Sequence, residues 1–459
     1  MARWIVADIA KAVKGELISG SPETEIRGVS TDTRSIRGGD LFVALEGERH
    51  DGHDFVAEAA GKGAAAVIVS ESRAVVVEPE VAALAVPDTL SALQKFARWH
   101  RLGFQGPVIG ITGSCGKTTV KELVAAVLGV KFQVAKTPLN FNNEIGVPLS
   151  VLGISDRTEV AVIELGTNAP GEISMLCDIA KPNRALITNI GRAHLEGFGT
   201  VEAVAEEKGA LVRSLDEQGT FYVNADDPFC AKIARDFPGK CVAFGEATDA
   251  QWRVVMFKMG LDGTPSTFTV EPLGLFTMQL FGRHSILNAA SAAVIGTDFG
   301  LSADQIQEGL SKAELPPMRM RMVNKGGRTF INDAYNANPE SMRAATEALV
   351  SWQSAGRKIA VVGDMLELGE ATVSEHKELG EFMAGVGVDV LIVLGQFAQH
   401  VAEGAVGGGL ADDAVKVGGD HAEVARLLAE VSASDDVILV KGSRGAAMEK
   451  VLEKFDASC

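Results

Sequence analysis

The stretch GITGSCGKTT, residues 110–119, completes the apolar run PVIGIT at 107–112 and begins a segment with helical spacing of apolar residues. A phosphate loop needs a strand, a tight turn with inward-pointing backbone N–H groups, a lysine, a hydroxyl and a helix N-terminus. Lys117 and Thr118 supply the lysine and the hydroxyl. The next helix has one apolar face, made of Val120, Leu123, Val124, Val127 and Leu128. All the parts of a nucleotide phosphate site are therefore present.

The glycines of this stretch depart from the strict spacing G-x-x-x-x-G-K-[ST]. Counting back from Gly116 puts the first glycine at position 111, where the chain has Ile111. Gly110 and Gly113 flank that position, so we interpret the turn as a loop variant that is one residue longer. The alternative is an ordinary strand-to-helix turn, and the strand, lysine, hydroxyl and helix around it favour the phosphate site.

The chain has 459 residues and a formal net charge of −17 at pH 7. At roughly 150 residues per domain, this length predicts about three domains. A strongly acidic chain is poorly suited to bind nucleic acid or an anionic membrane surface, so we expect no nucleic-acid partner. Anionic ligands would need local positive groups or metal ions. No segment reaches the roughly 18 apolar residues that span a bilayer, so we expect no membrane insertion.

The five cysteines are scattered, odd in number and without the paired spacing of a metal site. They are Cys115, Cys177, Cys230, Cys241 and Cys459. The opening MARWIVADIA lacks the basic and apolar regions of a secretory signal. We therefore expect a reducing, cytoplasmic location.

Short runs rich in Val, Ile and Ala alternate with helix-period segments, which is typical of α/β units with buried, mostly parallel strands. Breaks at Pro87 and at 313–317 divide the chain into three predicted domains, 1–86, 87–315 and 316–459. In the third, four strand candidates (TFIND, KIAVVGD, DVLIVLG and DVILVKG) predict a Rossmann-like unit. The predicted fold class is α/β: an N-terminal mixed α/β domain, a central parallel sheet of the phosphate-loop ATPase type and a C-terminal Rossmann-like domain.

Three polar residues outside the loop lie in positions that favour chemistry. Glu164 lies at the end of the strand EVAVIEL and His194 follows the strand ALITNI, where α/β sheets bind ligands. Lys208 falls on the apolar stripe of the helix VEAVAEEKGALV. Burial there would lower the lysine pKa and make its amine available, whereas the alternative is a side chain that reaches solvent past Gly209. His194 alone is typical of a hydrogen-bonded loop residue, but together with Lys208 and the phosphate loop it suggests a metal role.

Two motifs imitate other kinds of site. DFGLS at 298–302 has the letters of a kinase metal motif, but no H-R-D-x-x-x-x-N precedes it, so we interpret it as a helix end. HDGHD at 50–54 offers possible metal ligands, but so short a cluster is more typical of a polar turn. Neither changes the predicted phosphate site.

Together these residues resemble the Mur ligase family along essentially the whole chain. The family has its phosphate loop as G-[IV]-T-G-x-x-G-K-[ST]-[ST], which residues 110–119 match, so Ile111 follows the family pattern. The resemblance implies an N-terminal uridine-nucleotide domain, a central ATPase domain and a C-terminal domain that closes over both. It also implies that ATP is bound by the loop residues Gly113, Ser114, Cys115, Gly116, Lys117, Thr118 and Thr119.

The resemblance also implies roles for residues outside the loop. Thr118 and Glu164 would hold one Mg²⁺, His194 a second Mg²⁺, and Lys208 would react with CO₂ to give a carbamate that supports the second ion. Lys117, Lys208, His194 and Glu164 would form the catalytic set. Further ATP contacts would come from Asn288 near the adenine, Arg319, Asp333 near the ribose and Asn336.

The resemblance places the uridine nucleotide at the segment STDTR, with Ser30, Asp32 and Arg34. The segments GDMLELG, YNANP and NFNNEIGVPLSVL resemble those of the family member that adds a dipeptide, and Asn140 and Asn143 are implied substrate contacts. The implied reaction joins D-alanyl-D-alanine to UDP-N-acetylmuramoyl-tripeptide through an acyl phosphate and releases ADP and phosphate. Its product is the UDP-muramoyl-pentapeptide of peptidoglycan synthesis, on which the cell wall, cell shape and cell division depend. The third residue of the peptide is lysine or diaminopimelate, and the sequence does not distinguish the two.

A different class of function stays open from the sequence: a phosphate-loop kinase or a nucleotide switch with partner-binding outer domains. A ligase needs both a carboxylate substrate and an amine for ATP turnover, and a switch needs neither. We expect a monomer that binds small-molecule substrates. Cys115 lies in the loop at a helix N-terminus, where a thiol pKa can fall, and the alternative is an unreactive thiol at a variable position.

Overall fold

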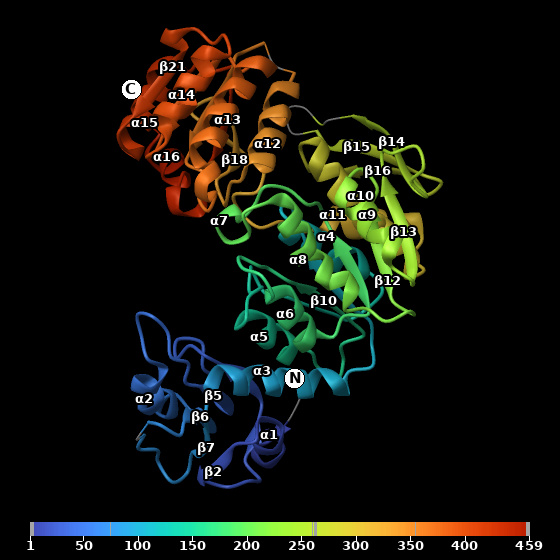
Figure 1. Ribbon diagram of the computed structural model, residues 1–459, viewed down its shortest axis with the longest axis vertical. Coiled ribbons are helices and arrows are strands. Elements are labelled where there is room, and N and C mark those ends of the chain that lie inside the picture. The colour runs from blue at the N-terminus through green and yellow to red at the C-terminus, as the bar shows by residue number, and fades with distance from the viewer. Residues whose placement is uncertain (1–3, 74, 259, 261–263, 354, 456–459) are drawn as a thin grey trace.

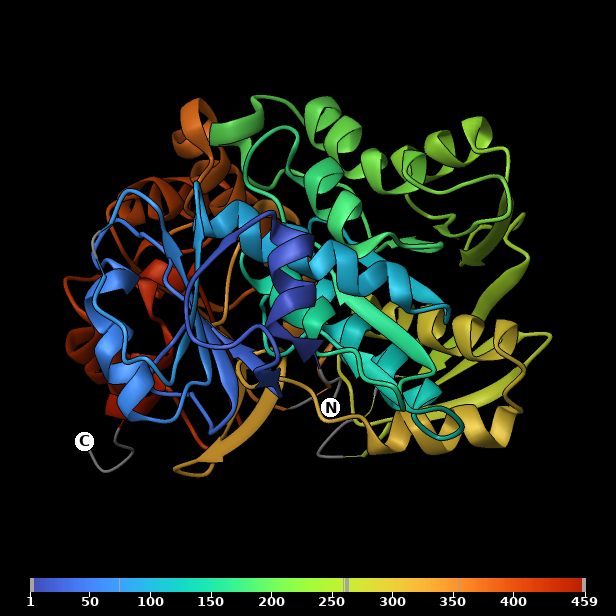
Figure 2. The ribbon, with the colours of Figure 1, turned by 90° about the horizontal axis from the view of Figure 1, so that it is seen from below.

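The computed structural model describes residues 4–73, 75–258, 260, 264–353 and 355–455, and Cys459 lies outside them. Three domains follow one another along the chain, each with its own main sheet. The N-terminal and C-terminal domains lie at opposite ends of the molecule with the central domain between them (Figure 1). In the view from below, the two outer domains lie on the left, and much of the central domain extends to the right, away from both (Figure 2). The predicted α/β class and three-domain architecture are confirmed.

The N-terminal domain has a five-stranded sheet in the order β2-β7-β6-β5-β4, in which β4 to β7 are parallel and β2 is antiparallel. Its strands are β2 Glu16–Ser19, β4 Gly28–Ser30, β5 Asp40–Val43, β6 Ala66–Ser70 and β7 Ala82–Val86. The other elements are β1 Trp4–Ile5, β3 Glu25–Ile26, α1 Val6–Val13, η1 Gly52–Phe55 and α2 Val56–Gly61. The strands β5 and β6 are buried almost throughout, which explains their continuous apolar sequence.

The central domain has a nine-stranded sheet in the order β16-β15-β14-β13-β12-β11-β8-β10-β9. The strands are β8 Val108–Thr112, β9 Val134–Lys136, β10 Val160–Glu164, β11 Arg184–Ile187, β12 Thr220–Asn224, β13 Lys240–Gly245, β14 Trp252–Lys258, β15 Ser266–Glu271 and β16 Gly274–Met278. The helices are α4 Lys117–Leu128, α5 Gly146–Leu152, α6 Glu172–Ala180, α7 Leu195–Phe198, α8 Val201–Arg213, α9 Pro228–Asp236, α10 Arg283–Asp298 and α11 Ala303–Lys312. The sheet is parallel except for its antiparallel edge of β14, β15 and β16.

Helix α3 Thr89–Gly103 joins the first two domains and confirms the predicted helix LSALQKFARWH. Asp88 begins it, since its carboxylate accepts the N–H groups of the first turn. Phe96 belongs to a hydrophobic cluster that continues from Val6 of the N-terminal domain to Ile163 of the central sheet. The N-terminal domain is therefore fixed to the central domain by apolar packing.

The C-terminal domain has a six-stranded sheet in the order β17-β18-β22-β19-β20-β21, parallel except for β17. Its strands are β17 Arg321–Lys325, β18 Arg328–Asp333, β19 Lys358–Gly363, β20 Val390–Leu394, β21 Val415–Gly418 and β22 Val437–Lys441. Its helices are α12 Pro339–Ser351, η2 Gly369–Ala371, α13 Thr372–Val386, α14 Ala398–Gly407, η3 Asp412–Ala414, α15 His421–Val431, η4 Arg444–Ala446 and α16 Glu449–Lys454.

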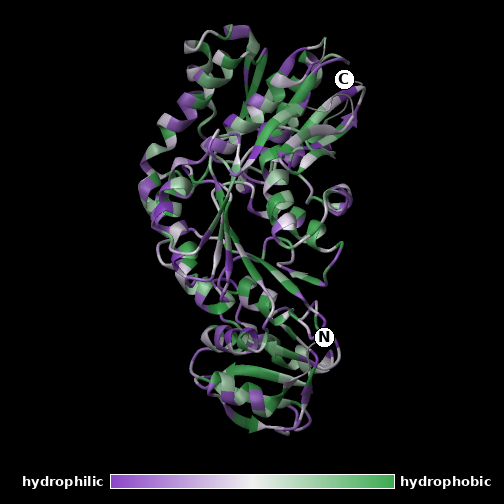
Figure 3. Cartoon of the chain, turned by 90° about the vertical axis from the view of Figure 1, so that its right-hand side faces the viewer, coloured by the Kyte–Doolittle hydropathy of each residue, from purple (hydrophilic) through white to green (hydrophobic). Residues whose placement is uncertain are grey.

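The four strands predicted for this domain are present, but β17 and β21 were not predicted. Both lie at an edge of the sheet and are partly exposed, so they lack the continuous apolar run of a buried strand. Figure 3 shows the contrast, with hydrophobic strands inside the domains and hydrophilic residues on the outer helices.

The two motifs that imitate other sites have structural roles. DFGLS follows the end of α10 at Asp298, and Gly300 turns the chain with a φ of +73°. In HDGHD, the Asp51 carboxylate accepts the N–H of His53, and His53 Nε2 accepts the N–H of Ser70. The predicted helix end and polar turn are confirmed. Within the described ranges, none of the helices combines the length and apolar character needed to cross a bilayer.

Candidate active site

The segment between β8 and α4 forms a tight loop at the carboxyl end of β8, inside the central sheet. Gly113 has a φ of +148° and Gly116 a φ of +79°, a region that favours glycine. A Cβ at Gly113 would overlap the hydroxyl of Thr188, and a Cβ at Gly116 would lie 3.0 Å from the amide of Asn288. Ile111 lies within the buried strand, before the turn begins. Backbone conformation and close neighbours therefore require both glycines of the predicted turn.

The loop is supported from the segment that follows β11. Asn189 accepts the N–H of Cys115 at 2.9 Å, and the hydroxyl of Thr188 donates to the Cys115 carbonyl at 2.5 Å. Lys117 Nζ donates to the Gly113 carbonyl at 2.7 Å, so the lysine spans the loop. Burial lowers the pKa of Lys117, and the nearby carboxylate of β10 opposes this shift. Hydrogen bonds from Thr188, Asn189 and Lys117 therefore help to hold the turn in shape.

Glu164 is the last residue of β10 and is 1% exposed. Its Oε1 accepts hydrogen bonds from Thr118 Oγ1 at 3.1 Å and from Asn142 Nδ2 at 2.8 Å. Its Oε2 is buried without a hydrogen-bond partner in the described part of the chain, and Lys121 Nζ lies 3.8 Å away. A buried carboxylate oxygen without a partner is costly, so this oxygen fits a bound cation.

A cavity of about 830 Å³ lies between the central and C-terminal domains, with the phosphate loop on its wall. The predicted residues on this wall are Ser114, Cys115, Gly116, Lys117, Thr118, Thr119, Asn140, Asn143, Glu164, His194, Asn288, Arg319, Asp333 and Asn336. The predicted residues that are not on it are Gly113, Lys208, Ser30, Asp32 and Arg34. The structure therefore brings most of the predicted ATP contacts together and leaves the uridine set elsewhere.

Arg319 of the C-terminal domain contacts the phosphate loop. Its Nη2 donates to Thr118 Oγ1 at 3.1 Å, and its guanidinium lies over the ring of Tyr335, 4.0 Å from the centroid. Since Thr118 also donates to Glu164, one line of hydrogen bonds crosses the two domains. The Nε of Arg319 is buried without a hydrogen-bond partner among the described residues, which suits an anionic ligand.

Asp333 and Asn336 are held by a lysine that the sequence analysis missed. Lys441 Nζ donates to Asp333 Oδ2 at 2.5 Å and to the Asn336 carbonyl at 2.9 Å. Lys441 is 2% exposed and is the last residue of β22. The rule that selects residues at strand carboxyl ends, which identified Glu164, would have found it.

The segment between β9 and α5 carries the predicted substrate contacts Asn140 and Asn143, both on the cavity wall. Asn143 Oδ1 accepts the N–H of Gly146 at 2.9 Å, at the start of α5. Asn142 lies between them in sequence and was missed, although its amide is the one that contacts Glu164. Sequence spacing does not show which asparagine of such a run faces the carboxylate.

Lys208 is 1% exposed on α8, so the buried alternative is confirmed and the solvent-reaching one is wrong. Burial lowers its pKa well below the ordinary value, and the charge of Lys117 lowers it further. It lies inside α8, between Glu207 and Gly209, which are also buried. Its neighbour Glu207 has a structural role, since its carboxylate accepts the N–H groups of Gly171 and Ile173 at 2.7 Å each. Lys208 is therefore a buried amine close to the loop.

His194 follows β11 in a left-handed conformation, with a φ of +56°. Its Nδ1 lies 2.5 Å from Glu367 Oε2 of the C-terminal domain, and this hydrogen bond lowers the pKa of Glu367. Across the described ranges, no three or more His, Cys, Asp or Glu side chains converge as a metal site. A metal ion at His194 would therefore need ligands from phosphate, water or a modified lysine.

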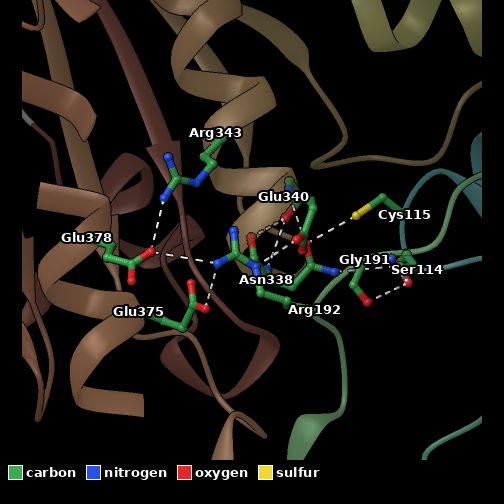
Figure 4. A network of polar contacts seen from close by, with 10 residues as sticks. Ser114, Cys115, Gly191, Arg192, Asn338, Glu340, Arg343, Glu375 and Glu378 are labelled. Carbon is green, nitrogen blue, oxygen red and sulfur yellow. Dashed lines mark hydrogen bonds and ion pairs between the residues drawn. The ribbon is translucent and has the colours of Figure 1, made fainter. Parts of the chain in front are cut away.

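Cys115 differs from the expectation for a thiol at a helix N-terminus. Burial raises its pKa, and the hydrogen bond that its Sγ donates to Asn338 Oδ1 at 3.1 Å only opposes this (Figure 4). Loss of solvent disfavours the charged thiolate, and the charge of Glu340 acts in the same direction. The direction of this shift is opposite to the expected lowering, while Cys115 lies on the cavity wall, so its reactivity toward alkylation stays a prediction.

The residues predicted for the uridine nucleotide form a turn at the end of β4. The Asp32 carboxylate accepts the backbone N–H of Arg34 at 2.9 Å and its Nη2 at 2.6 Å, which lowers the pKa of Asp32. Ser30 Oγ donates to the Asp32 carbonyl at 2.9 Å. This site stays a prediction.

Three family models match most of the chain. The model described as "Mur ligase family, catalytic domain" matches residues 25–101, and "Mur ligase middle domain" matches 111–296. The model "Mur ligase, glutamate ligase domain" matches 318–444. The matches follow the same order as the three sheets.

Full-length relatives agree with these models. The UDP-N-acetylmuramoyl-tripeptide--D-alanyl-D-alanine ligase of Bacillus subtilis (strain 168) is 37% identical over 99% of this chain and 98% of its own length. The ligase of the same name from Escherichia coli (strain K12) is 35% identical over 97% of each chain. A crystal structure of MurF from Acinetobacter baumannii has a TM-score of 0.88 at 33% identity, covering 99% of this chain and 98% of that one. The MurF ligase from Thermotoga maritima in complex with ADP has a TM-score of 0.81 at 33% identity, covering 94% and 97%. The chain therefore belongs to the Mur ligase family.

Proposed function

We propose that this protein is an ATP-dependent amide ligase that joins D-alanyl-D-alanine to UDP-N-acetylmuramoyl-tripeptide. The observation that carries the proposal is the cavity in which the phosphate loop, Glu164 and Arg319 meet from two domains. Relatives of nearly equal length whose names state this reaction support it, as does a related structure that holds ADP. The product is the pentapeptide precursor of peptidoglycan.

The reaction joins two anions before it forms an amide. An oxygen of the terminal carboxylate bonds to the γ-phosphorus of ATP, and the bond from phosphorus to the ADP oxygen breaks. The amine of D-alanyl-D-alanine then bonds to the acyl carbon, phosphate leaves, and the amine proton passes to phosphate or water. Because carboxylate and triphosphate repel each other, Lys117, the loop N–H groups and Arg319 would act by neutralising and aligning charge.

The site fits a divalent cation beside the phosphate loop. Glu164 offers a buried oxygen without a hydrogen-bond partner, and Thr118 Oγ1 is its neighbour. Mg²⁺ is usually held by one or two carboxylates together with substrate phosphates, which agrees with this sparse set of ligands. When bound, the ion would neutralise developing charge on the phosphate oxygens. A second Mg²⁺ at His194 is part of the same proposal.

Lys208 is proposed to carry CO₂ as a carbamate. Its burial and lowered pKa favour the neutral amine, which is the form that bonds to the carbon of CO₂ and releases a proton. The modification would replace the buried amine by an anion, which the nearby charge of Lys117 attracts. Both effects support the modification at this position.

The proposal keeps the domain boundaries 1–86, 87–315 and 316–459, which the breaks between β7 and α3 and between α11 and β17 support. Ser30, Asp32 and Arg34 are proposed to bind the uridine nucleotide, and Asn140 and Asn143 to contact the peptide part. The use of ATP supports a cytoplasmic location. One chain supplies both sides of the cavity, which supports a monomer.

The test is phosphate release from ATP with UDP-N-acetylmuramoyl-tripeptide and D-alanyl-D-alanine supplied singly and together. A ligase releases phosphate at its full rate only when both substrates are present. A nucleotide switch needs neither substrate and releases phosphate from ATP in their absence. Lys117→Ala should abolish turnover and leave binding of the uridine substrate intact. Turnover that needs only one substrate, or that persists in this variant, would refute the proposal.

A further inference from the structure

The C-terminal domain is attached to the central domain differently from the N-terminal domain. Within the described residues, its hydrophobic clusters include one side chain of the central domain, Phe281, whose ring lies 4.8 Å from that of Trp352. The N-terminal domain, by contrast, shares a continuous apolar cluster with the central sheet. Ala371 of η2 also packs against the cluster of the other two domains, and polar contacts hold much of the rest of the boundary beside the cavity.

Arg192 makes the most extensive of these contacts (Figure 4). Its Nε lies 3.0 Å from Glu340 Oε1, and its Nη1 lies 2.8 Å from Glu375 Oε1 and 3.7 Å from Glu378 Oε2. Glu340 is in the first turn of α12, and the other two glutamates are on α13. One guanidinium of the central domain thus binds two helices of the C-terminal domain.

The acidic side of this contact has an excess of charge. Arg343 lies 3.5 Å from Glu378, so two arginines face three glutamates. The Oε2 atoms of Glu340 and Glu375 are buried without a hydrogen-bond partner in the described chain. Burial raises the pKa of Glu375, and the charge of Arg192 opposes this rise. Without Arg192 the three carboxylates would repel one another and lose their contact with the central domain.

The same contact is joined to the phosphate loop. Ser114 Oγ accepts the N–H of Gly191 at 2.9 Å and donates to its carbonyl at 3.1 Å. Asn338, which caps α12, accepts the hydrogen bond of Cys115 and donates to the Ser114 carbonyl at 3.4 Å. A Cβ at Gly191 would lie 2.7 Å from the carboxyl carbon of Glu340, so the glycine permits this close approach. The loop and the start of α12 are therefore packed together.

We propose that Arg192 is a positioning residue, which docks the C-terminal domain on the phosphate loop so that Arg319 reaches Thr118. Arg192 is not on the cavity wall, as far as the described residues define it, so it acts through the position of the domain. The inference rests on the proposed function, because Arg319 is taken to act on the ATP of that reaction.

The test combines Arg192 and Arg319 variants and measures phosphate release with both substrates. Arg192→Met should lower kcat/KM by about 10- to 100-fold, the worth of hydrogen bonds to charged partners, and Arg192→Lys should lose less. In an Arg319→Ala background, Arg192→Met should have almost no further effect, because the group it positions is gone. Arg426→Met is the matched control, since Arg426 contacts two glutamates within α15 only.

Small-angle scattering of the full chain gives a readout that needs no turnover. Arg192→Met should increase the radius of gyration, and Arg426→Met should leave it unchanged. The positioning role would be overturned if the two substitutions together lowered kcat/KM by the product of their separate effects. It would also be overturned if Arg192→Met lowered activity without changing the radius of gyration. If Arg192→Met does not fold, Arg192→Lys in the same two backgrounds carries the test. A wild-type chain that fails to turn over would refute the proposed function, and the scattering comparison would still decide the docking.

Discussion

Replacing Lys121 by methionine tests how much of the site depends on one buried charge. Lys121 lies one helical turn after Lys117 on α4 and is 0% exposed. Its Nζ donates to the carbonyls of Thr137 at 2.8 Å and Leu139 at 2.6 Å, and it lies 3.0 Å from Glu122 Oε1. It therefore ties the phosphate-loop helix to the segment that leads to the predicted substrate contacts.

The magnitude follows from what Lys121→Met leaves behind. Glu122 keeps its contact with Lys136, but the unpartnered oxygen of Glu164 loses the ammonium that lies 3.8 Å away. Removing one partner of a buried ion pair costs about 3–5 kcal/mol, because the remaining charge stays buried. The equilibrium constant for folding should therefore fall by roughly two to four powers of ten, at about 1.4 kcal/mol per power of ten.

Urea unfolding of the full chain, followed by circular dichroism, measures this loss. Adding Mg²⁺ with ADP should raise the midpoint more in Lys121→Met than in the wild type, because a cation at Glu164 replaces part of the missing charge. Lys131→Met is the control, since this lysine is exposed and should change stability by less than about 0.5 kcal/mol. A loss below about 1 kcal/mol in Lys121→Met would refute the reasoning, because a buried unpaired charge cannot cost so little.

Three further predictions concern Lys208 and Gly113. Lys208→Ala should lose most activity and recover part of it in short carboxylic acids that occupy the place of the carbamate; full activity in the variant would exclude Lys208 from the mechanism. Because burial lowers the Lys208 pKa, the unfolded chain binds the extra proton, so the free energy of unfolding should rise with pH. Urea unfolding from about pH 7 to 10 should show a steeper rise in the wild type than in Lys208→Met, and equal slopes would indicate a charged lysine in the folded chain. Gly113→Ala should weaken binding of a fluorescent ATP analogue at least about tenfold, because the new Cβ overlaps Thr188; unchanged affinity would show that the loop tolerates a side chain.

The parts of the site that sequence could predict are those built from consecutive residues. A strand, a glycine turn, a lysine and a helix lie next to one another along the chain, so their spacing alone predicts the phosphate loop at Gly113 and Lys117. Periodicity likewise placed Lys208 on the apolar stripe of α8. It could not decide between burial and escape to solvent, because that depends on which elements cover the end of the side chain.

Edge strands and the partners of residues far away in the chain could not be predicted, because neither leaves a pattern in consecutive residues. The strands β17 and β21 are partly exposed, so they lack the apolar run that marks β8 or β22. The strand-end rule could have found Lys441, but not its partner Asp333, which is 108 residues away in the chain.

The sequence by itself determined the α/β class, the three-domain order, the phosphate loop and the resemblance to one ligase family. These depend on local spacing and on the period of apolar residues, which do not require knowledge of distant neighbours. Only the tertiary structure decided that Arg319 reaches Thr118, that Glu367 forms a hydrogen bond with His194 and that Arg192 binds two helices of the C-terminal domain. Such polar contacts form between surfaces that meet only after each domain has folded, so no pattern along the chain specifies them.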